Sequence, residues 1–297
     1  INSSLYGVVS EGRRHPETID RIYGMINGIE GFLNNTILDF SEALPGEKLD
    51  GLKFTPGAYL GSCRYKLPES LEDPFYPKLF EKFNEMNIGW FFYIGGNDSM
   101  DTIKKLSDYA IVKGHEQKFL GVPKTIDNDL AATDHTPGYG SAAKYIGSIT
   151  KEVIRDGLVY DQQNVTILEI MGRNAGWLTG AAALAKCEDC EGPDMIFLPE
   201  VTFDVDEFMH KVAELHKKKK SVVVAVSEGV KTADGRYVCE LTDGIEFVDA
   251  FGHKQLTGTA RFLAEKINRE VGCKTRAIEF NSLQRCASHI VSRVDIT

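Results

Sequence analysis

The strongest constraint on the fold is a repeated alternation between apolar segments of strand length and amphipathic segments of helix length. Five apolar runs predict buried strands, at 90–94, 119–122, 165–170, 195–198 and 222–226. Four segments, near 101–113, 139–156, 205–219 and 256–271, have the periodicity of amphipathic helices. Because parallel strands need crossover connections, this alternation predicts an α/β fold with mostly parallel sheets flanked by helices.

Length and charge exclude several classes of protein. A chain of 297 residues can form one large domain or two closely packed lobes with substantial cores. The net charge of -9 argues against a long nucleic-acid groove or a basic membrane face. The lysine run at 217–220 ends an amphipathic segment and is interpreted as a solvated helix C-terminus. The chain has no apolar run of about 18 residues, so we expect no membrane span. Because of its acidic charge, we also expect no nucleic-acid partner.

The cysteines favour a reduced protein. Six are scattered along the chain, and only Cys187 and Cys190 form a CxxC pair. A structural zinc site normally needs a second ligand pair at suitable spacing, and none is evident. We therefore expect a reduced, cytoplasmic chain, with a metal or redox role for the pair as the alternative.

Polar turns follow four of the predicted strands. They are Gly95–Ser99, Pro123–Asp129, Met171–Arg173 and Ser227–Gly229. In parallel sheets, ligands bind beyond the carboxyl ends of the strands. The sequence therefore predicts that these turns converge on one cleft.

Two of these turns contain residues suited to phosphate chemistry. Gly95 and Gly96 allow an anion to approach a helix N-terminus, although they equally fit a plain capped turn. Asp127 and Asp129 would point to the same side of an extended segment and could divide proton transfer and metal binding. Taken alone, these two acids fit a solvated turn, but the nearby Lys124 adds a phosphate-neutralising cation.

Three arginines are further candidates for anion binding. Arg173 comes directly after a glycine at a strand end, and its guanidinium suits phosphate oxygens. Arg276 and Arg285 flank a strand pattern at 277–280. Surface salt bridges or plain solvation remain the alternative for each of them.

Taken together, these segments resemble the phosphofructokinase family. GGNDS is similar to the family's GGDGS or GGDDS turn, PKTIDND to its P-G/K-TIDND segment, MGR with 174–177 to its MGR-x-x-G element, and LGSCR at 60–64 to its LGSxR. Segments at 199–201, 227–229, 275–277 and 283–285 follow in family order. The resemblance covers nearly the whole chain, and so many motifs in order are highly specific.

The resemblance implies two Rossmann-like lobes. Residues 1–135 would form a donor-binding lobe, residues 136–285 a sugar-phosphate lobe, and residues 286–297 the start of a helix that returns to the first lobe. Family members carry a glycine-rich phosphate turn before a segment like 1–9 and continue past 285, so we expect a chain incomplete at both ends. They are commonly dimers or tetramers, which implies a homo-oligomer.

The resemblance also implies a role for each matching residue. Asp127 would accept the proton of the sugar 1-hydroxyl, and Arg173 and Arg64 would stabilise charge on the transferred phosphoryl group. Gly96 and Thr125 would cradle phosphate and sugar. Fructose 6-phosphate would be held by Met171, Gly172, Glu228, Arg276 and Arg285.

The implied cofactor is Mg²⁺. Asp129 would orient or bind the ion, and Asn97 would lie beside it. Asn97 replaces the more usual aspartate of the family, and a neutral amide binds magnesium more weakly than a carboxylate.

Asp98 and Lys124 indicate the phosphoryl donor. Both resemble the pyrophosphate-dependent branch of the family, where ATP-using relatives have glycine in the second GG turn and often before TIDND. A carboxylate about 4 Å from the ATP α-phosphate would cost roughly 4 kcal/mol at an effective dielectric of about 20, or about a thousandfold in preference. Lys124 would neutralise the phosphate leaving group. The implied reaction converts pyrophosphate and fructose 6-phosphate reversibly into phosphate and fructose 1,6-bisphosphate.

Three alternatives remain. An ATP-dependent phosphofructokinase would share most motifs but would not need Asp98 or Lys124. Another kinase with a related glycine turn, such as an NAD kinase, would lack the TIDND and MGR segments. A non-catalytic regulatory subunit would not need Asp127 and Arg173.

Overall fold

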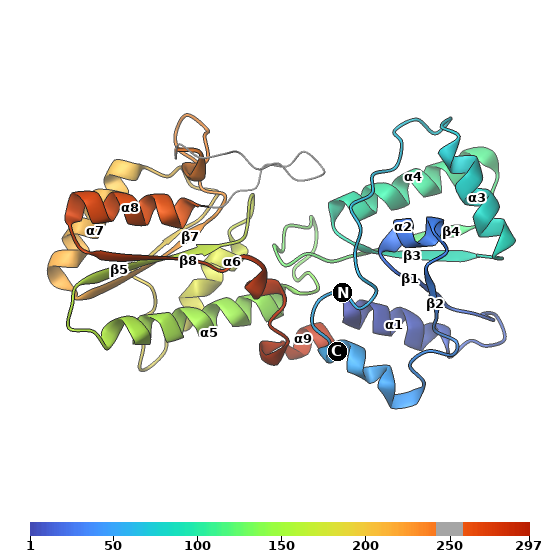
Figure 1. Cartoon of the computed structure of the whole chain (residues 1–297), viewed down its shortest axis with the longest axis horizontal. Coiled ribbons are helices and arrows are strands. Elements are labelled where there is room, and N and C mark those ends of the chain that lie inside the picture. The colour runs from blue at the N-terminus through green and yellow to red at the C-terminus, as the bar shows by residue number, and fades with distance from the viewer. Residues whose placement is uncertain (242–257) are drawn as a thin grey trace. The chain divides into compact units, whose positions relative to one another are not determined.

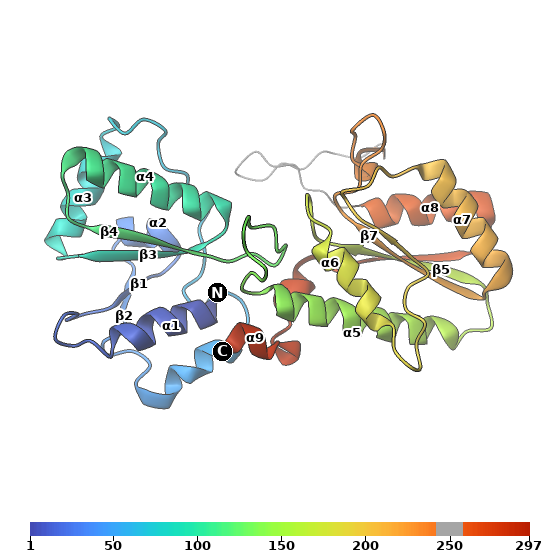
Figure 2. The same cartoon turned by 180° about the vertical axis from the view of Figure 1, so that it is seen from behind.

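The computed structural model describes residues 1–241 and 258–297, which divide into two compact units. Ile1–Thr125 and Arg293–Thr297 form the first unit, and Ile126–Ser292 form the second. The expected boundary at residue 135 therefore falls inside the second unit. Each unit combines helices with a parallel sheet (Figures 1 and 2), so the predicted α/β fold is confirmed.

The first unit contains a parallel and an antiparallel strand pair. Strands β3 and β4 are parallel, and β1 and β2 are antiparallel. The elements in chain order are α1 Asn2–Gly12, β1 Tyr23–Met25, α2 Gly28–Leu33, β2 Ile37–Asp39, η1 Gly46–Lys48, η2 Asp50–Phe54, α3 Phe75–Glu85, β3 Trp90–Gly95, α4 Asn97–Lys113, β4 Lys118–Pro123 and, near the end of the chain, α9 Arg293–Ile296.

Residues 90–94 and 119–122 form strands β3 and β4 as predicted, but the prediction that these strands are buried was wrong. Phe91 and Phe119 pack with α3 and α4 in an aromatic core. Trp90 and Leu120 are 52% and 42% exposed. Phe92 is exposed as well, so three large apolar side chains of this strand pair remain open to solvent. A continuous apolar run could not reveal this, because it gives no information on how many layers cover a strand.

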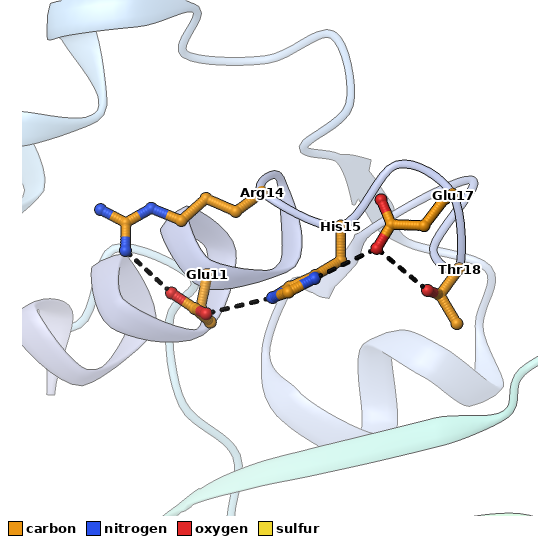
Figure 3. Close-up of polar contacts among 5 residues, drawn as sticks. All are labelled: Glu11, Arg14, His15, Glu17 and Thr18. Carbon is orange, nitrogen blue, oxygen red and sulfur yellow. Dashed lines mark hydrogen bonds and ion pairs between the residues drawn. The ribbon is translucent and has the colours of Figure 1, made fainter.

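A polar network surrounds the end of α1 (Figure 3). His15 lies between Glu11 and Glu17, with 3.2 Å from each ring nitrogen to a carboxylate oxygen, and Arg14 pairs with Glu11 at 3.1 Å. The hydrogen bonds to Glu11 and Glu17 raise the pKa of His15. Because these side chains are exposed, water screens the pairs and they add little stability.

The second unit is built on a four-stranded parallel sheet of order β6-β7-β5-β8. Its elements are α5 Tyr139–Leu158, β5 Asn164–Ile170, α6 Trp177–Gly180, η3 Ala181–Ala185, β6 Met195–Phe197, α7 Val205–Lys218, β7 Ser221–Ser227, η4 Val238–Leu241, α8 Thr259–Val271, β8 Lys274–Glu279, η5 Asn281–Arg285 and η6 Ser288–Ile290.

Helices cover both faces of this sheet. Val165 and Ile167 of β5 pack with α7 and α8, whereas Leu168 and Ile170 pack with α5 and α6. Figure 1 shows α7 and α8 on the opposite side of the sheet from α5. Every residue of β5 and β7 is buried as a result, which explains why these strands are apolar runs rather than alternating patterns.

The predicted elements agree with the structure at most positions. All five predicted strands occur, and β8 covers the expected pattern at 277–280 except its last residue. Helix α4 begins at Asn97, earlier than the expected 101, because the polar Asn97-Asp98-Ser99 turn is helical. Residues 256–257 of the last predicted helix lie outside the described residues, and α8 begins at Thr259. In the parts of the chain that the structure describes, no helix has the length and apolar character needed to cross a bilayer.

Ile167→Ala should destabilise the second unit. Ile167 lies in the centre of β5 and is fully buried, so truncation should lower the free energy of unfolding by about 2–5 kcal/mol. Urea titration followed by circular dichroism measures this change. The control Leu158→Ala, at a side chain 66% exposed, should change it by less than about 0.5 kcal/mol. Equal effects of the two variants would contradict the buried position of β5.

Candidate active site

In the first unit, the glycine turn joins β3 to the N-terminus of α4. Gly96 caps α4, and its carbonyl accepts hydrogen bonds from the amides of Ser99 and Met100 at 3.0 and 3.1 Å. A Cβ on Gly95 would lie 1.9 Å from the Ser99 hydroxyl, so only glycine fits there. Because the first amides of a helix have no intrahelical acceptor, this turn presents donors to an anion.

The side chains at this helix N-terminus are polar and exposed. Asn97 and Asp98 occupy the first turn of α4, and both are exposed. The helix dipole stabilises the Asp98 carboxylate there. The same carboxylate repels a second anion that extends toward it, so this end of α4 combines backbone donors for one phosphate with a charge that opposes another.

Lys124 and Thr125 follow the neighbouring strand β4 and are anchored to the same turn. The Lys124 amide donates to the Gly95 carbonyl at 2.9 Å, which continues the parallel pairing of β3 and β4 by one residue. Lys124 and Thr125 are both partly buried. The first unit therefore places a lysine and an aspartate on two adjoining loops at one sheet edge.

Arg64 lies in the loop before α3. The preceding Cys63 packs its sulfur 3.8 Å from the Tyr93 hydroxyl on β3. Gly61 has a φ of +70°, and a Cβ there would lie 2.2 Å from the Asn27 side chain. These contacts fix the LGSCR loop against β3 and leave Arg64 exposed.

In the second unit, two turns meet at the carboxyl ends of β5 and β7. Ile170 and Ser227 are directly paired, and the Glu228 amide donates to the Ile170 carbonyl at 2.9 Å. The Gly172 amide then donates to the Glu228 carboxylate at 3.4 Å. The segments 171–173 and 228–229 are thus held side by side.

Glu228 is a predicted site residue whose pKa is strongly shifted by its surroundings. Its pKa is raised to about 7, mainly by burial and also by the negative charges of Glu169 and Asp127. The Gly172 amide and the positive charge of Arg173 act in the opposite direction. The charges of Asp127 and Arg173 therefore both act on Glu228. A carboxyl group with a pKa near 7 can donate or accept a hydrogen bond near neutral pH, which suits a sugar hydroxyl.

The premise that Asp127 and Asp129 lie on an extended segment was wrong. Asn128 between them is in the left-handed region, with φ of +56°, and is buried. Its side-chain oxygen accepts hydrogen bonds from the amide and hydroxyl of Thr136, at 2.9 and 3.1 Å. This anchor bends the loop, so Asp127 is partly buried while Asp129 is exposed.

The two late arginines lie in different places. Arg285 is the last residue of η5, which follows β8. Because β5, β7 and β8 are parallel, Arg285 comes after the same, carboxyl-terminal ends of the strands as the turns after β5 and β7. Arg276 is near the amino-terminal end of β8, where it pairs with Asp156 at 2.8 Å and stacks 5.3 Å from the Tyr160 ring. Within one chain, Arg276 is therefore not brought together with Glu228 and Arg173.

Three buried polar residues escaped prediction. Ser227, Gln284 and Asn128 each hold the backbone of a turn that carries candidate site residues. Each stands within or beside a motif, but a buried anchor and an exposed turn residue look alike in sequence. Only the buried surroundings distinguish them.

The proposed metal ligands supply oxygen donors. Asn97 and Asp129 are exposed, and the described residues include no group of three or more His, Cys, Asp or Glu side chains suited to a metal ion. Mg²⁺ commonly uses one or two carboxylates together with substrate phosphates and waters. The amide oxygen of Asn97 in the first unit and the carboxylate of Asp129 in the second are each of a kind that suits magnesium arriving with a phosphate substrate.

Comparisons with known proteins agree on one family. The family model described as Phosphofructokinase matches residues 1–292. The chain is 39% identical to a pyrophosphate–fructose 6-phosphate 1-phosphotransferase of Halomonas elongata, over 100% of this chain and 70% of the relative. An enzyme of the same name from Xanthomonas campestris is 40% identical, over 99% of this chain and 70% of the relative. The crystal structure of a pyrophosphate-dependent phosphofructokinase from Nitrosospira multiformis superimposes with a TM-score of 0.85 at 36% identity, covering 99% of this chain and 69% of that one.

Glu169 should make the stability of the protein pH-dependent. Its carboxylate accepts hydrogen bonds from the amides of Gly258 and Ala260 at the start of α8, at 3.3 and 2.8 Å. Burial nevertheless raises its pKa from 4.5 to about 7. Between these values the folded state binds more protons than the unfolded state, so the free energy of unfolding falls as pH rises from about 4.5 to 7, by about 3 kcal/mol.

Glu169→Gln should flatten this slope. Urea titrations at several pH values compare the variant with the wild type, so that titrations shared by both largely cancel. The stability difference between variant and wild type should move in favour of the variant as pH rises. An unchanged difference across the window would show that Glu169 ionises normally in the folded protein.

Proposed function

The chain belongs to the phosphofructokinase family, and from this premise we propose that it transfers a phosphoryl group from inorganic pyrophosphate to the 1-hydroxyl of fructose 6-phosphate. The products are fructose 1,6-bisphosphate and phosphate. The reaction is reversible, because the bonds broken and formed are closer in energy than when ATP is the donor.

One observation carries the choice of donor. Asp98 lies in the first turn of α4, and the backbone of Lys124 is hydrogen-bonded to Gly95 at the end of β3, which leads into this helix. Backbone amides and a lysine stabilise the two phosphoryl groups of pyrophosphate, whereas the Asp98 carboxylate opposes the additional phosphate of a nucleotide. An aspartate and a lysine at these positions thus favour a short donor over ATP.

The transfer itself needs few groups. Asp127 accepts the proton of the sugar hydroxyl as it attacks, and Arg173 and Arg64 stabilise the charge on the phosphoryl group in flight. The positive charge of Arg173 lowers the pKa of Glu228, which supports a position of Arg173 close to this site residue. Lys124 stabilises the departing phosphate, and Gly96 and Thr125 accommodate the donor and the sugar.

The turns after β5, β7 and β8 bind the sugar phosphate. Met171 and Gly172 supply backbone contacts, Glu228 binds a sugar hydroxyl, and Arg285 binds the 6-phosphate. Arg276 already pairs with Asp156 at the other end of its strand. We therefore propose that Arg276 serves the 6-phosphate of a second copy, which makes the working form a homo-oligomer.

Mg²⁺ is the proposed cofactor, held by Asp129 and Asn97 with phosphate oxygens of the substrate. When bound, it neutralises charge on the phosphates. The six cysteines are all free thiols, which supports the cytoplasm as the compartment.

Asp98→Gly should change the donor preference. The wild type should turn over fructose 6-phosphate with pyrophosphate and barely with ATP. The variant should gain ATP-dependent turnover and lose pyrophosphate-dependent rate, shifting the ratio of kcat/KM values by roughly two to three orders of magnitude. A coupled assay with each donor measures both.

Asp98→Asn separates charge from size in the same assay. If the charge causes the discrimination, this variant should gain part of the ATP activity although its side chain is as large as that of aspartate. A wild type that prefers ATP would overturn the proposed function, and an unchanged preference in both variants would overturn the electrostatic explanation.

Asp127→Ala should lower kcat by about a hundredfold to ten-thousandfold, because general base catalysis is lost. Asp134→Ala is the matched control, since this exposed aspartate lies in the same loop, and it should retain most of the rate. Full turnover by Asp127→Ala would exclude Asp127 as the base.

A further inference from the structure

We propose that Ser227 is a positioning residue for the phosphoryl transfer, acting through the Gly172 peptide on Arg173. The inference rests on the proposed function, because Arg173 is the group that Ser227 would orient. Ser227 itself is fully buried and contacts backbone rather than substrate.

The hydroxyl of Ser227 connects the two turns that carry the site residues. It donates to the Gly172 carbonyl at 2.6 Å and accepts from the Gly229 amide at 3.0 Å. One oxygen therefore satisfies a carbonyl directly before Arg173 and an amide directly after Glu228. Since both partners are backbone groups, the bond fixes the peptide planes and not merely the side chains.

The surrounding backbone leaves little room for another arrangement. A Cβ on Gly229 would lie 2.1 Å from the Arg173 carbonyl oxygen, and a Cβ on Gly172 would lie 2.5 Å from the Ala175 carbonyl oxygen. Gly172 has a φ of +137°, a conformation that other residues rarely adopt. Gly229 thus allows the two turns to touch, Gly172 allows its own turn to close tightly, and Ser227 supplies the polar bond between the turns.

A second side chain restrains the same turn from η5, which follows β8, the other neighbour of β5. The Met171 amide donates to the Gln284 side-chain oxygen at 3.3 Å, and the Gln284 nitrogen donates to the Asn281 carbonyl at 3.0 Å. Gln284 is also buried. Met171 and Gly172 are therefore held from both sides of β5, and the next residue along the chain is Arg173.

Ser221 at the opposite end of β7 offers a matched control. It is also buried, and its hydroxyl donates to the Asn164 side chain at 3.1 Å. Ser221→Ala removes one buried hydroxyl bond from the same strand, far along the sheet from the turns. Any difference between the two alanine variants reports the location of the bond rather than the loss of a hydroxyl.

The experiment compares Ser227→Ala, Ser227→Thr and Ser221→Ala by steady-state kinetics with pyrophosphate and by hydrogen–deuterium exchange. Ser227→Ala should lower kcat by about tenfold to a hundredfold, because a small misplacement of a catalytic group has an effect of this size. Its KM for pyrophosphate should change less than its kcat. Ser227→Thr restores the hydroxyl and should recover most of the rate, and Ser221→Ala should keep the wild-type kcat.

Hydrogen–deuterium exchange tests the role of Ser227 in holding the turn independently of the proposed function, because it needs no substrate. Peptides covering 169–176 should exchange faster in Ser227→Ala than in the wild type or in Ser221→Ala at the same temperature. A wild type inactive with pyrophosphate would overturn the proposed function alone. Equal exchange in these peptides, or equal kcat for the two alanine variants, would overturn the role of Ser227.

Discussion

The in-register pairing of β5 with β7 is the constraint on which the sugar-phosphate side of this protein depends. Both strands are buried on both faces, so their register cannot shift without exposing apolar residues or burying polar ones. Because Ile170 is opposite Ser227, the turns after the two strands must lie side by side. The contacts of Gly172 with Glu228 and with Ser227 follow directly from this register.

A different principle operates in the first unit, where backbone and charge define the donor. The end of β3 and the start of α4 present amides, and the extension of β4 brings in Lys124. These groups would attract any phosphate. Selectivity between donors needs a group that opposes the longer one, and Asp98 is a carboxylate in the right turn for this. The attraction and the repulsion thus come from adjoining loops of one unit.

Much of this could be predicted from sequence, with failures that have physical causes. The apolar runs and helical periods predicted the strands and the α/β class, and the pattern is clearest in β5 and β7, which are buried on both faces. Exposure of Trp90 and Leu120 could not be predicted, because it depends on which layers are present. The bend at Asn128 was missed because its cause is a bond to Thr136, eight residues away. Arg276 could not be placed, since its partner Asp156 is 120 residues away in the chain.

A crystal structure with a non-hydrolysable diphosphate such as imidodiphosphate, together with fructose 6-phosphate, tests the donor site most directly. The account predicts the anion at the N-terminus of α4, with the Lys124 ammonium within hydrogen-bonding distance and the Asp98 carboxylate beyond the terminal phosphoryl group, where a nucleotide would continue. A diphosphate bound away from both side chains would contradict it.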